Sequence, residues 1–192
     1  MDATDTRALR DLITGYGALQ AGKQVTAQAR GQQFNTLIAS VLRWWGIDAQ
    51  VNARGHAGRD EIDVVFAIGQ SRFLLEAKWL KAPVSADPLA KLHDRIRSRA
   101  SGTRGVLLSM SGYTKAALDA AANNKWPDVL LLDRGHFEAM LSGLTDPASL
   151  LTAVPDHASY HGDSYADLTS LLIDRQPCTP PTFTTVPPAT LP

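Results

Sequence analysis

The sequence lacks the usual marks of a secreted, disulfide-bonded or membrane protein. It contains one cysteine, Cys178, among 192 residues, which excludes an internal disulfide and a cluster of thiolates that could bind zinc. No apolar run reaches the roughly 20 residues of a membrane-spanning helix. The first residues, MDATDTRALRDL, are acidic and polar, so we expect no signal peptide and a cytoplasmic location.

The chain also lacks a net charge, with 19 basic and 19 acidic residues. Proteins that bind nucleic acid usually carry a basic surplus, so this balance at first argues against DNA. The charge is unevenly distributed, however. Residues 1–115 hold 16 Lys and Arg against 10 Asp and Glu, whereas residues 116–192 hold 3 against 9. The zero total therefore excludes nothing, because it conceals a basic first part of the chain.

Hydrophobic periodicity predicts an α/β domain. Apolar residues recur at helical spacing over 27–45, the short β-branched apolar run over 61–68 predicts a strand, and RFLLEAKWL over 72–80 predicts a second. Gly69-Gln70 between these strands suits a two-residue hairpin turn of type II′. Asp87 is expected to be the N-cap and Pro88 the first residue of a helix over 87–101. We further expect strands at 47–51, 105–110 and 128–132, a loop at 52–59, and helices at 113–123 and 134–141.

This order favours parallel crossovers after the hairpin. The sequence is divided into an N-terminal helical arm (1–24), a main domain (25–143) and a short helical extension packed on the domain (144–175). Residues 176–192 contain six of the 11 prolines, which predicts a disordered tail.

Three charged residues on the hairpin form the most informative group. Side chains two residues apart in a strand share a face, so Glu76 and Lys78 are expected to project together. If Gly69-Gln70 is the turn, Asp63 lies directly opposite Glu76 and Glu61 lies opposite Lys78. Two carboxylates and an ammonium would then share a small patch of sheet.

Paired carboxylates suggest a divalent cation, because Mg²⁺ is commonly held by one or two carboxylates and by phosphate oxygens of a substrate. Asp63 and Glu76 would hold Mg²⁺, or Mn²⁺ in its place, against a phosphodiester, and Lys78 would orient or help deprotonate the attacking water. An ordinary ion-pair cluster of Glu61, Glu76 and Lys78 is the competing interpretation, because Glu-x-Lys is common by chance.

The sequence resembles the PD-(D/E)xK restriction-endonuclease-like superfamily, and within it the Mrr-type branch. The residues that carry the resemblance are Arg30-Gly31-x-x-Phe34, Glu61-Ile62-Asp63, Leu75-Glu76-Ala77-Lys78-Trp79, Gly102-Thr103-Arg104-Gly105-Val106, Ser109-Met110-Ser111-Gly112-Tyr113 and Leu141-Ser142-Gly143. The resemblance covers about 30–143 well and 144–175 loosely. It implies a three-layer core of order αβββαβ, with a mixed sheet flanked by helices, and makes 25–143 a nuclease-like domain.

By the same resemblance, Asp63, Glu76 and Lys78 take the metal-binding and catalytic roles. The family often has a glutamate on its first helix where this chain has Asn35, so Asn35, Gln33 and Glu61 are treated as accessory candidates. DNA is the expected partner, and a homodimer is left open. The expected DNA-binding residues are Lys91, Arg95, Arg97, Arg99, Arg104, Ser111 and Tyr113, although a solvated helix face would also explain the basic run.

The function predicted from the sequence is therefore Mg²⁺-dependent endonucleolytic hydrolysis of DNA, in defence against foreign or modified DNA. Two alternatives remain: a catalytically weak or inactive DNA-binding module of the same fold, and an interaction subunit that recruits a partner through its Pro-rich tail and the acidic C-terminal third of the chain. We expect no nucleotide cofactor, because Gly17-x-x-x-x-Gly22-Lys23 is followed by Gln24 rather than the Ser or Thr of a P-loop.

Overall fold

The structure, a computed structural model, describes residues 3–22, 26–54, 61–123, 128–161 and 165–174. The Pro-rich tail and most of the predicted loop at 52–59 lie outside these residues. No helix in the described part of the chain is both long and apolar enough to cross a membrane.

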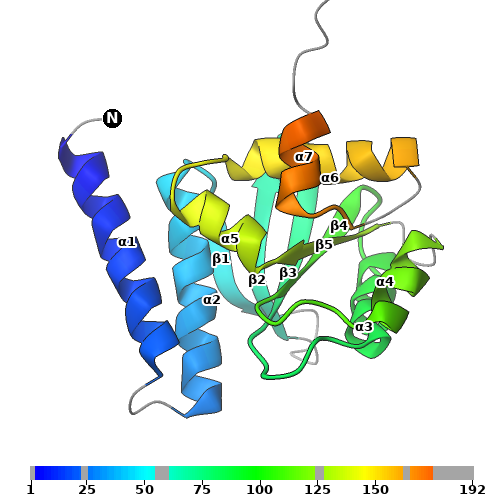
Figure 1. Ribbon diagram of the computed structural model, residues 1–192, viewed down its shortest axis with the longest axis horizontal. Coiled ribbons are helices and arrows are strands. Elements are labelled where there is room, and N and C mark those ends of the chain that lie inside the picture. The colour runs from blue at the N-terminus through cyan, green and yellow to red at the C-terminus, as the bar shows by residue number, and fades with distance from the viewer. Residues whose placement is uncertain (1–2, 23–25, 55–60, 124–127, 162–164, 175–192) are drawn as a thin grey trace, which may run out of the picture.

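A five-stranded sheet forms the centre of the molecule, with its strands in sequence order (Figure 1). The strands β1, β2 and β3 are antiparallel, whereas β4 runs parallel to both β3 and β5. The strands are β1 (Ala49–Arg54), β2 (Glu61–Ile68), β3 (Ser71–Lys78), β4 (Thr103–Ser109) and β5 (Val129–Asp133). The mixed sheet and the parallel crossovers predicted from the sequence are confirmed.

The helices are α1 (Ala3–Ala21), α2 (Ala27–Trp44), α3 (Ala86–Arg97), α4 (Lys115–Ala122), α5 (Arg134–Leu141), α6 (Pro147–His161) and α7 (Leu168–Asp174). The run α2, β1, β2, β3, α3, β4 reproduces the expected αβββαβ order.

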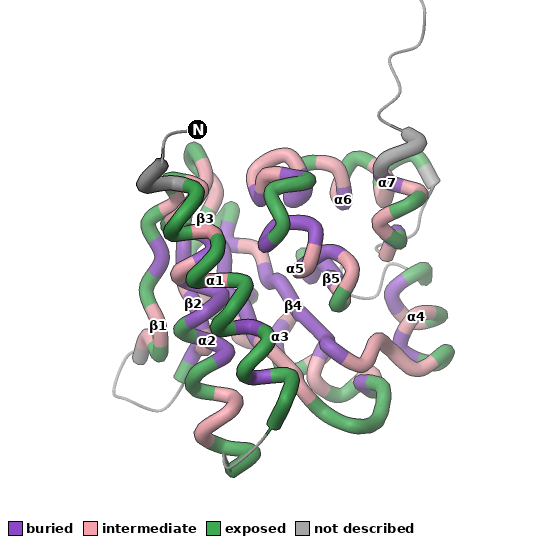
Figure 2. The backbone as a smooth tube through the Cα atoms, turned by 60° about the vertical axis from the view of Figure 1, so that its left-hand side comes forward, coloured by how far each residue is buried: buried purple, intermediate pink, exposed green. Residues whose placement is uncertain are grey.

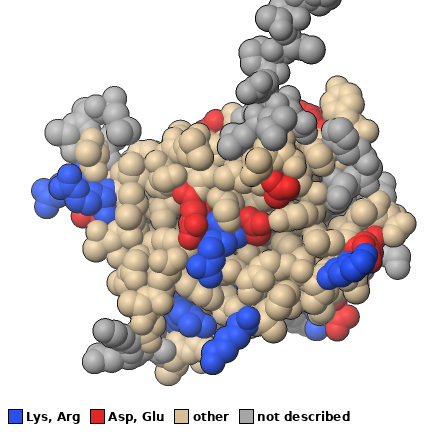
Figure 3. All heavy atoms as spheres, in the orientation of Figure 1, with Lys and Arg blue, Asp and Glu red and all other residues tan. Residues whose placement is uncertain are grey.

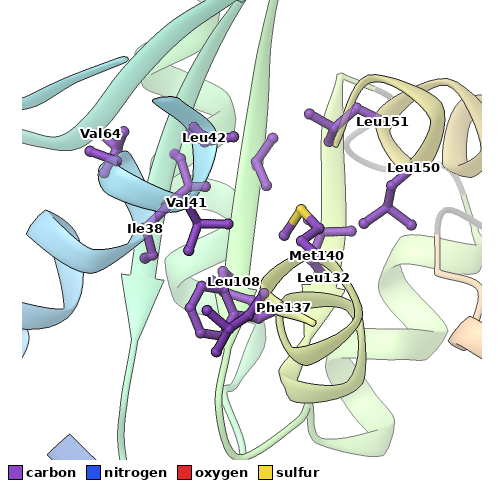
Figure 4. Close-up of a cluster of buried hydrophobic side chains, with 14 of the residues drawn as sticks. Ile38, Val41, Leu42, Val64, Leu108, Leu132, Phe137, Met140, Leu150 and Leu151 are labelled. Atoms are coloured by element: carbon purple, nitrogen blue, oxygen red, sulfur yellow. The ribbon is translucent and has the colours of Figure 1, made fainter. Parts of the chain in front are cut away.

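Two apolar cores lie on opposite faces of the sheet. The larger core joins one face to α1, α2, α5, α6 and α7, and the smaller joins the other face to α3 and α4. Figure 4 shows the larger core, where Ile38 and Val41 of α2 meet Phe137 and Met140 of α5 over Leu108 of β4. Strand β4 is buried along most of its length (Figure 2). Its alternate side chains enter both cores, which fixes both layers against one strand.

The hairpin turn lies where the sequence predicts it. Ile68 pairs with Ser71, and Gly69 has a φ of +57°, as the first central residue of a type II′ turn requires. The predicted boundaries of two other elements are wrong. Strand β1 extends over residues expected to begin a loop, and Ser85, not Asp87, is the N-cap of α3. Pro88 is tolerated in the first turn of α3 because its missing N–H would have no partner within the helix.

The N-terminal helix α1 packs beside α2 and reaches α5, and most of it is exposed (Figure 2). Tyr16 is its main anchor. The Tyr16 hydroxyl donates to Glu138 Oε1 at 2.7 Å, and its ring contacts Phe137 and Trp79. Because Trp79 follows Lys78 directly, α1 packs near the end of the strand that carries the predicted site.

Candidate active site

The β2–β3 hairpin opens at the residues that the sequence singles out. Strand pairing runs from the turn as far as Val64 and Leu75 and then stops. Beyond that point, the carboxylate of Asp63 inserts between the strands and accepts the backbone N–H of Ala77 at Oδ2, over 2.8 Å. The other oxygen, Oδ1, accepts Nδ2 of Asn35 on α2 at 3.0 Å. Asp63 therefore replaces a direct backbone contact and links the sheet to the helix layer.

This opening changes one sequence prediction. The predicted register holds up to Val64 and Leu75, but its continuation is not formed: Asp63 does not pair with Glu76, and Glu61 does not pair with Lys78. Glu61 is exposed, and on the other edge of β2 it lies in register with Arg54 of β1. The physical reason is the side-chain hydrogen bond of Asp63, which holds the strands apart where backbone pairing would otherwise continue.

Glu76 lies on the face of the sheet that α3 covers, and its side chain is 11% exposed. Lys78 Nζ lies 3.2 Å from Glu76 Oε2, and Arg95 Nη1 of α3 contacts Glu76 Oε1. Burial and the Asp63 carboxylate raise the pKa of Glu76 above its usual value, while Lys78 and Arg95 oppose that rise.

An open depression of about 160 Å³ lies over Glu76, between β3 and α3. Its lining combines one carboxylate with three cations: Glu76, Lys78, Lys91 and Arg95, together with Pro88, Leu92 and Leu107. Lys91 and Arg95 are one turn apart on α3 and therefore project from one side of it. The depression thus presents basic side chains around a buried carboxylate.

Gly105 on β4 lets α3 lie close enough to form this depression. A Cβ at Gly105 would lie 2.5 Å from Ile96 Cδ1 and 2.9 Å from Leu92 Cγ. These separations are shorter than van der Waals contact, so only glycine permits this spacing. This close packing of α3 on the sheet brings the side chain of Arg95 within contact distance of Glu76.

Two residues that our sequence reasoning did not assign support the end of β3. Arg30 of α2 donates from Nη2 to the carbonyl oxygen of Trp79 at 3.2 Å, and its guanidinium lies over the Trp79 ring. Phe34 contacts the same ring edge-on. The Arg30-Gly31-x-x-Phe34 motif, noted for its resemblance alone, therefore anchors the residue that follows Lys78.

The three accessory candidates differ in burial and in contact with Asp63. Asn35 is buried and touches Asp63, whereas Gln33 and Glu61 are exposed. Asn35 donates its amide group to the carboxylate, so it takes part in positioning Asp63.

The expected DNA-binding residues do not form one surface. Lys91 and Arg95 line the depression, and Arg97 is exposed at the end of α3. Arg104 lies in register with Phe73, toward the hairpin turn, and borders a different cavity beside α6. The two-residue period of a strand directs Arg104 away from the face that carries Leu107 and α3. The structure therefore places Arg104 apart from Lys91 and Arg95 of α3.

The remaining expected DNA contacts are engaged within the protein, apart from Arg99, which follows α3 and is half-buried. Ser111 donates its hydroxyl to the carbonyl of Ala82 at 2.7 Å, and the Tyr113 hydroxyl lies within hydrogen-bond distance of the carbonyls of Leu107 and Leu132. Ser111 and Tyr113 thus hold the segment after β4 against its neighbours. On the face shown in Figure 3, acidic and basic side chains lie among one another. The uneven distribution of charge along the sequence therefore does not divide this face into a basic half and an acidic half.

The donor set fits Mg²⁺ or Mn²⁺ held by two carboxylates. Within the described residues, no group of three or more His, Cys, Asp or Glu side chains is placed to hold a metal ion. The carboxylates of Asp63 and Glu76 lie on the two strands of the hairpin and offer hard oxygen donors, and Mg²⁺ sites often take their other ligands from water and phosphate.

Comparisons with known proteins identify the family. A family model described as restriction endonuclease, of the Mrr catalytic-domain type, matches residues 26–141. A search of curated proteins finds no match. Among solved structures, the protein of unknown function AF1548 is 20% identical with a TM-score of 0.48, covering 69% of this chain and 78% of its own.

Two restriction endonucleases are also similar. MspJI, solved with a 27-mer oligonucleotide, is 15% identical with a TM-score of 0.44, and the match covers 83% of this chain and 39% of MspJI. The DNA modification-dependent enzyme AspBHI is 20% identical with a TM-score of 0.42, covering 83% of this chain and 41% of AspBHI. The chain thus spans about two-fifths of either enzyme. The family match extends over more than half of the sequence, and the chain belongs to the Mrr-type restriction endonuclease family of the PD-(D/E)xK superfamily.

Proposed function

We propose that the protein is a Mg²⁺-dependent endonuclease that hydrolyses DNA phosphodiester bonds, in defence against foreign or modified DNA. One observation carries the proposal. In a chain of a restriction endonuclease family, Asp63 binds the backbone N–H of Ala77 on the neighbouring strand, between Glu76 and Lys78, and the Lys78 ammonium lies 3.2 Å from Glu76. Mn²⁺ would serve in the same place.

Each residue has a separate task in this proposal. Asp63 and Glu76 would hold the cation, which when bound polarises the scissile phosphate and lowers the pKa of an attacking water. Lys78 lies at the end of β3 and borders the open depression, where it can orient that water and hold or accept a proton at Nζ. Arg30 and Phe34 keep the backbone after Lys78 in place through Trp79.

The α3 cations would contact the DNA backbone. Lys91 is exposed beside the depression, and a Lys–phosphate contact adds affinity without reading sequence. Lys91→Ala should therefore weaken binding to duplexes of different sequence alike and reduce the salt dependence by about one counterion. An unchanged salt slope would remove Lys91 from the interface. The proposal also includes a cytoplasmic location, where such DNA would be met, and leaves dimerisation open.

Nicking of supercoiled plasmid tests the proposed activity. The wild type should nick plasmid with Mg²⁺ or Mn²⁺ and lose this activity in EDTA, and Lys78→Ala should reduce the rate by about 10²–10⁴-fold. Lys115→Ala is the matched control, because Lys115 is an exposed α4 lysine paired with Asp119. If Lys78→Ala cleaves like the wild type, or neither protein cleaves with either metal, the proposal fails.

The contact between Asn35 and Asp63 favours a second candidate, a DNA-binding module of the same fold with little or no catalysis. An amide donor beside Asp63 supplies no negative charge, so it does not add to metal binding as a carboxylate would. This candidate predicts DNA binding without cleavage, and activity that appears in Asn35→Glu. Cleavage by the wild type excludes it.

A further inference from the structure

Glu76, one of the two carboxylates proposed to hold the metal ion, is already paired with two cations of the protein. One Glu76 oxygen contacts Arg95 and the other lies 3.2 Å from Lys78. Both oxygens of this largely buried carboxylate are therefore neutralised by cations of the protein itself. A divalent cation approaching Glu76 meets like charges and has to displace at least one of them.

The two cations differ in how easily they can leave. Lys78 is two residues from Glu76 on the same strand, so it remains nearby whatever it contacts. Arg95 reaches Glu76 from a separate helix by a long side chain, which is 31% exposed. A guanidinium has five N–H donors in a planar fork, and this fork matches the geometry of a phosphate as well as that of a carboxylate. Arg95 can therefore exchange Glu76 for a phosphate that enters the depression.

We propose that Arg95 couples DNA binding to metal binding: it occupies Glu76 in the free protein and moves to a DNA phosphate, which frees Glu76 for the metal ion. The inference rests on the proposed function and adds an order to it, with weak metal binding before DNA and tight metal binding after it. Lys91, one turn earlier on α3 and beside the same depression, supplies a second cation to hold the incoming phosphate. By thermodynamic reciprocity, the metal ion also strengthens DNA binding.

Mn²⁺ binding to the full chain tests this coupling directly, because it needs no turnover. Calorimetric titration is carried out with and without a phosphorothioate duplex, which keeps the backbone charge and resists hydrolysis. Without DNA, Arg95→Met should bind Mn²⁺ about tenfold more tightly than the wild type. The duplex should tighten Mn²⁺ binding to the wild type and have much less effect on Arg95→Met. The methionine keeps an apolar stem against α3 while removing the charge.

Arg72→Met is the matched control, because Arg72 is exposed at the far end of the same strand as Glu76. It should bind Mn²⁺ like the wild type in both conditions. Arg95→Gln carries the same expectation as Arg95→Met, should the methionine variant fold poorly. Equal Mn²⁺ affinity of the wild type and both Arg95 variants without DNA, or an equal gain from DNA in all three, would overturn the coupling. Plasmid nicking by the wild type is scored separately, and its absence would overturn the proposed function instead.

Discussion

Asp63 and Glu76 lie on the two strands of one hairpin, yet different kinds of donor hold them. Asp63 accepts two neutral donors, the Asn35 amide and the Ala77 backbone N–H. Glu76 contacts two cations, Lys78 and Arg95. The Ala77 donor belongs to the sheet, so Asp63 cannot turn away without leaving a strand N–H unpaired. Glu76 can exchange its partners, because the Arg95 side chain can move. Asp63 thus fixes the geometry of the site, and Glu76 is its adjustable half.

The largest effect is expected from removing the charge of either carboxylate. Asp63→Asn and Glu76→Gln should each reduce plasmid cleavage by at least about 100-fold, because a metal ligand contributes more than the residues that merely orient it. The two variants should differ in stability. The asparagine that replaces Asp63 would have only one acceptor oxygen for the two N–H donors of Asn35 and Ala77. One of these donors would then lack a partner, which costs about 1–3 kcal/mol of folding free energy. Activity in rate assays and unfolding in urea measure the two effects.

Equal loss of stability in Asp63→Asn and Glu76→Gln would contradict the difference between the two halves of the site. Cleavage retained by either variant would contradict its role as a metal ligand.

Replacing the neutral donor with a charge should break the anchoring of Asp63. Asn35→Asp removes the amide donor and places a second carboxylate beside Asp63, so it should destabilise the fold by about 1–3 kcal/mol without metal. Mn²⁺ should recover much of this loss. Urea unfolding with and without Mn²⁺ measures both. Asn35→Ala, which loses the donor without adding a charge, is the control, and a response to Mn²⁺ as large as that of Asn35→Asp would refute the explanation.

Moving α3 away from the sheet should destabilise the fold and weaken the contact between Arg95 and Glu76. In Gly105→Ala, the new methyl group would overlap Ile96 and Leu92, and overpacking of this kind costs about 1–3 kcal/mol. Gly17→Ala in α1 is the control, because no atom lies within 4 Å of a Cβ there. That helical substitution should stabilise by up to about 1 kcal/mol. Thermal unfolding compares them, and a neutral Gly105→Ala would show that the close approach of α3 is not required.

The smallest effect is a pH dependence that belongs to Glu76. Burial and Asp63 raise the pKa of Glu76 in the folded protein above its usual value near 4.5. The folded state therefore disfavours the ionised form. This cost is absent below the unfolded pKa, appears as pH rises between the two values, and is complete above the folded one. Relative to Glu76→Gln, the wild type should lose stability as pH rises from 4.5 toward neutrality. A difference that stays constant with pH, measured by urea unfolding, would exclude this shift.

Much of this site follows from local rules. The apolar alternation of β2 and β3, with a glycine at the turn, fixes the register up to Val64 and Leu75, and places Glu76 and Lys78 on one face. The order of helices and strands predicts the parallel crossovers. These features depend on residues close together in sequence, so period and turn chemistry specify them.

The features that could not be predicted depend on contacts between distant segments. The strands part at Asp63 because of a hydrogen bond to Ala77 and another to Asn35 on α2. Arg95 reaches Glu76 because Gly105, on a third element, lets α3 lie close. Arg104 belongs to a basic run in sequence, but the strand in which it lies turns it to another face. The spacing of residues along the sequence does not predict contacts between segments that are far apart in the chain.

The position of a bound metal ion tests the central claim most directly. Crystals of the wild type grown with Mn²⁺ and a phosphorothioate duplex would locate the ion by anomalous scattering. We predict one peak between the carboxylates of Asp63 and Glu76, with Arg95 turned from Glu76 toward a phosphate. A Mn²⁺ ion bound elsewhere, with Arg95 still on Glu76 beside bound DNA, would contradict the account.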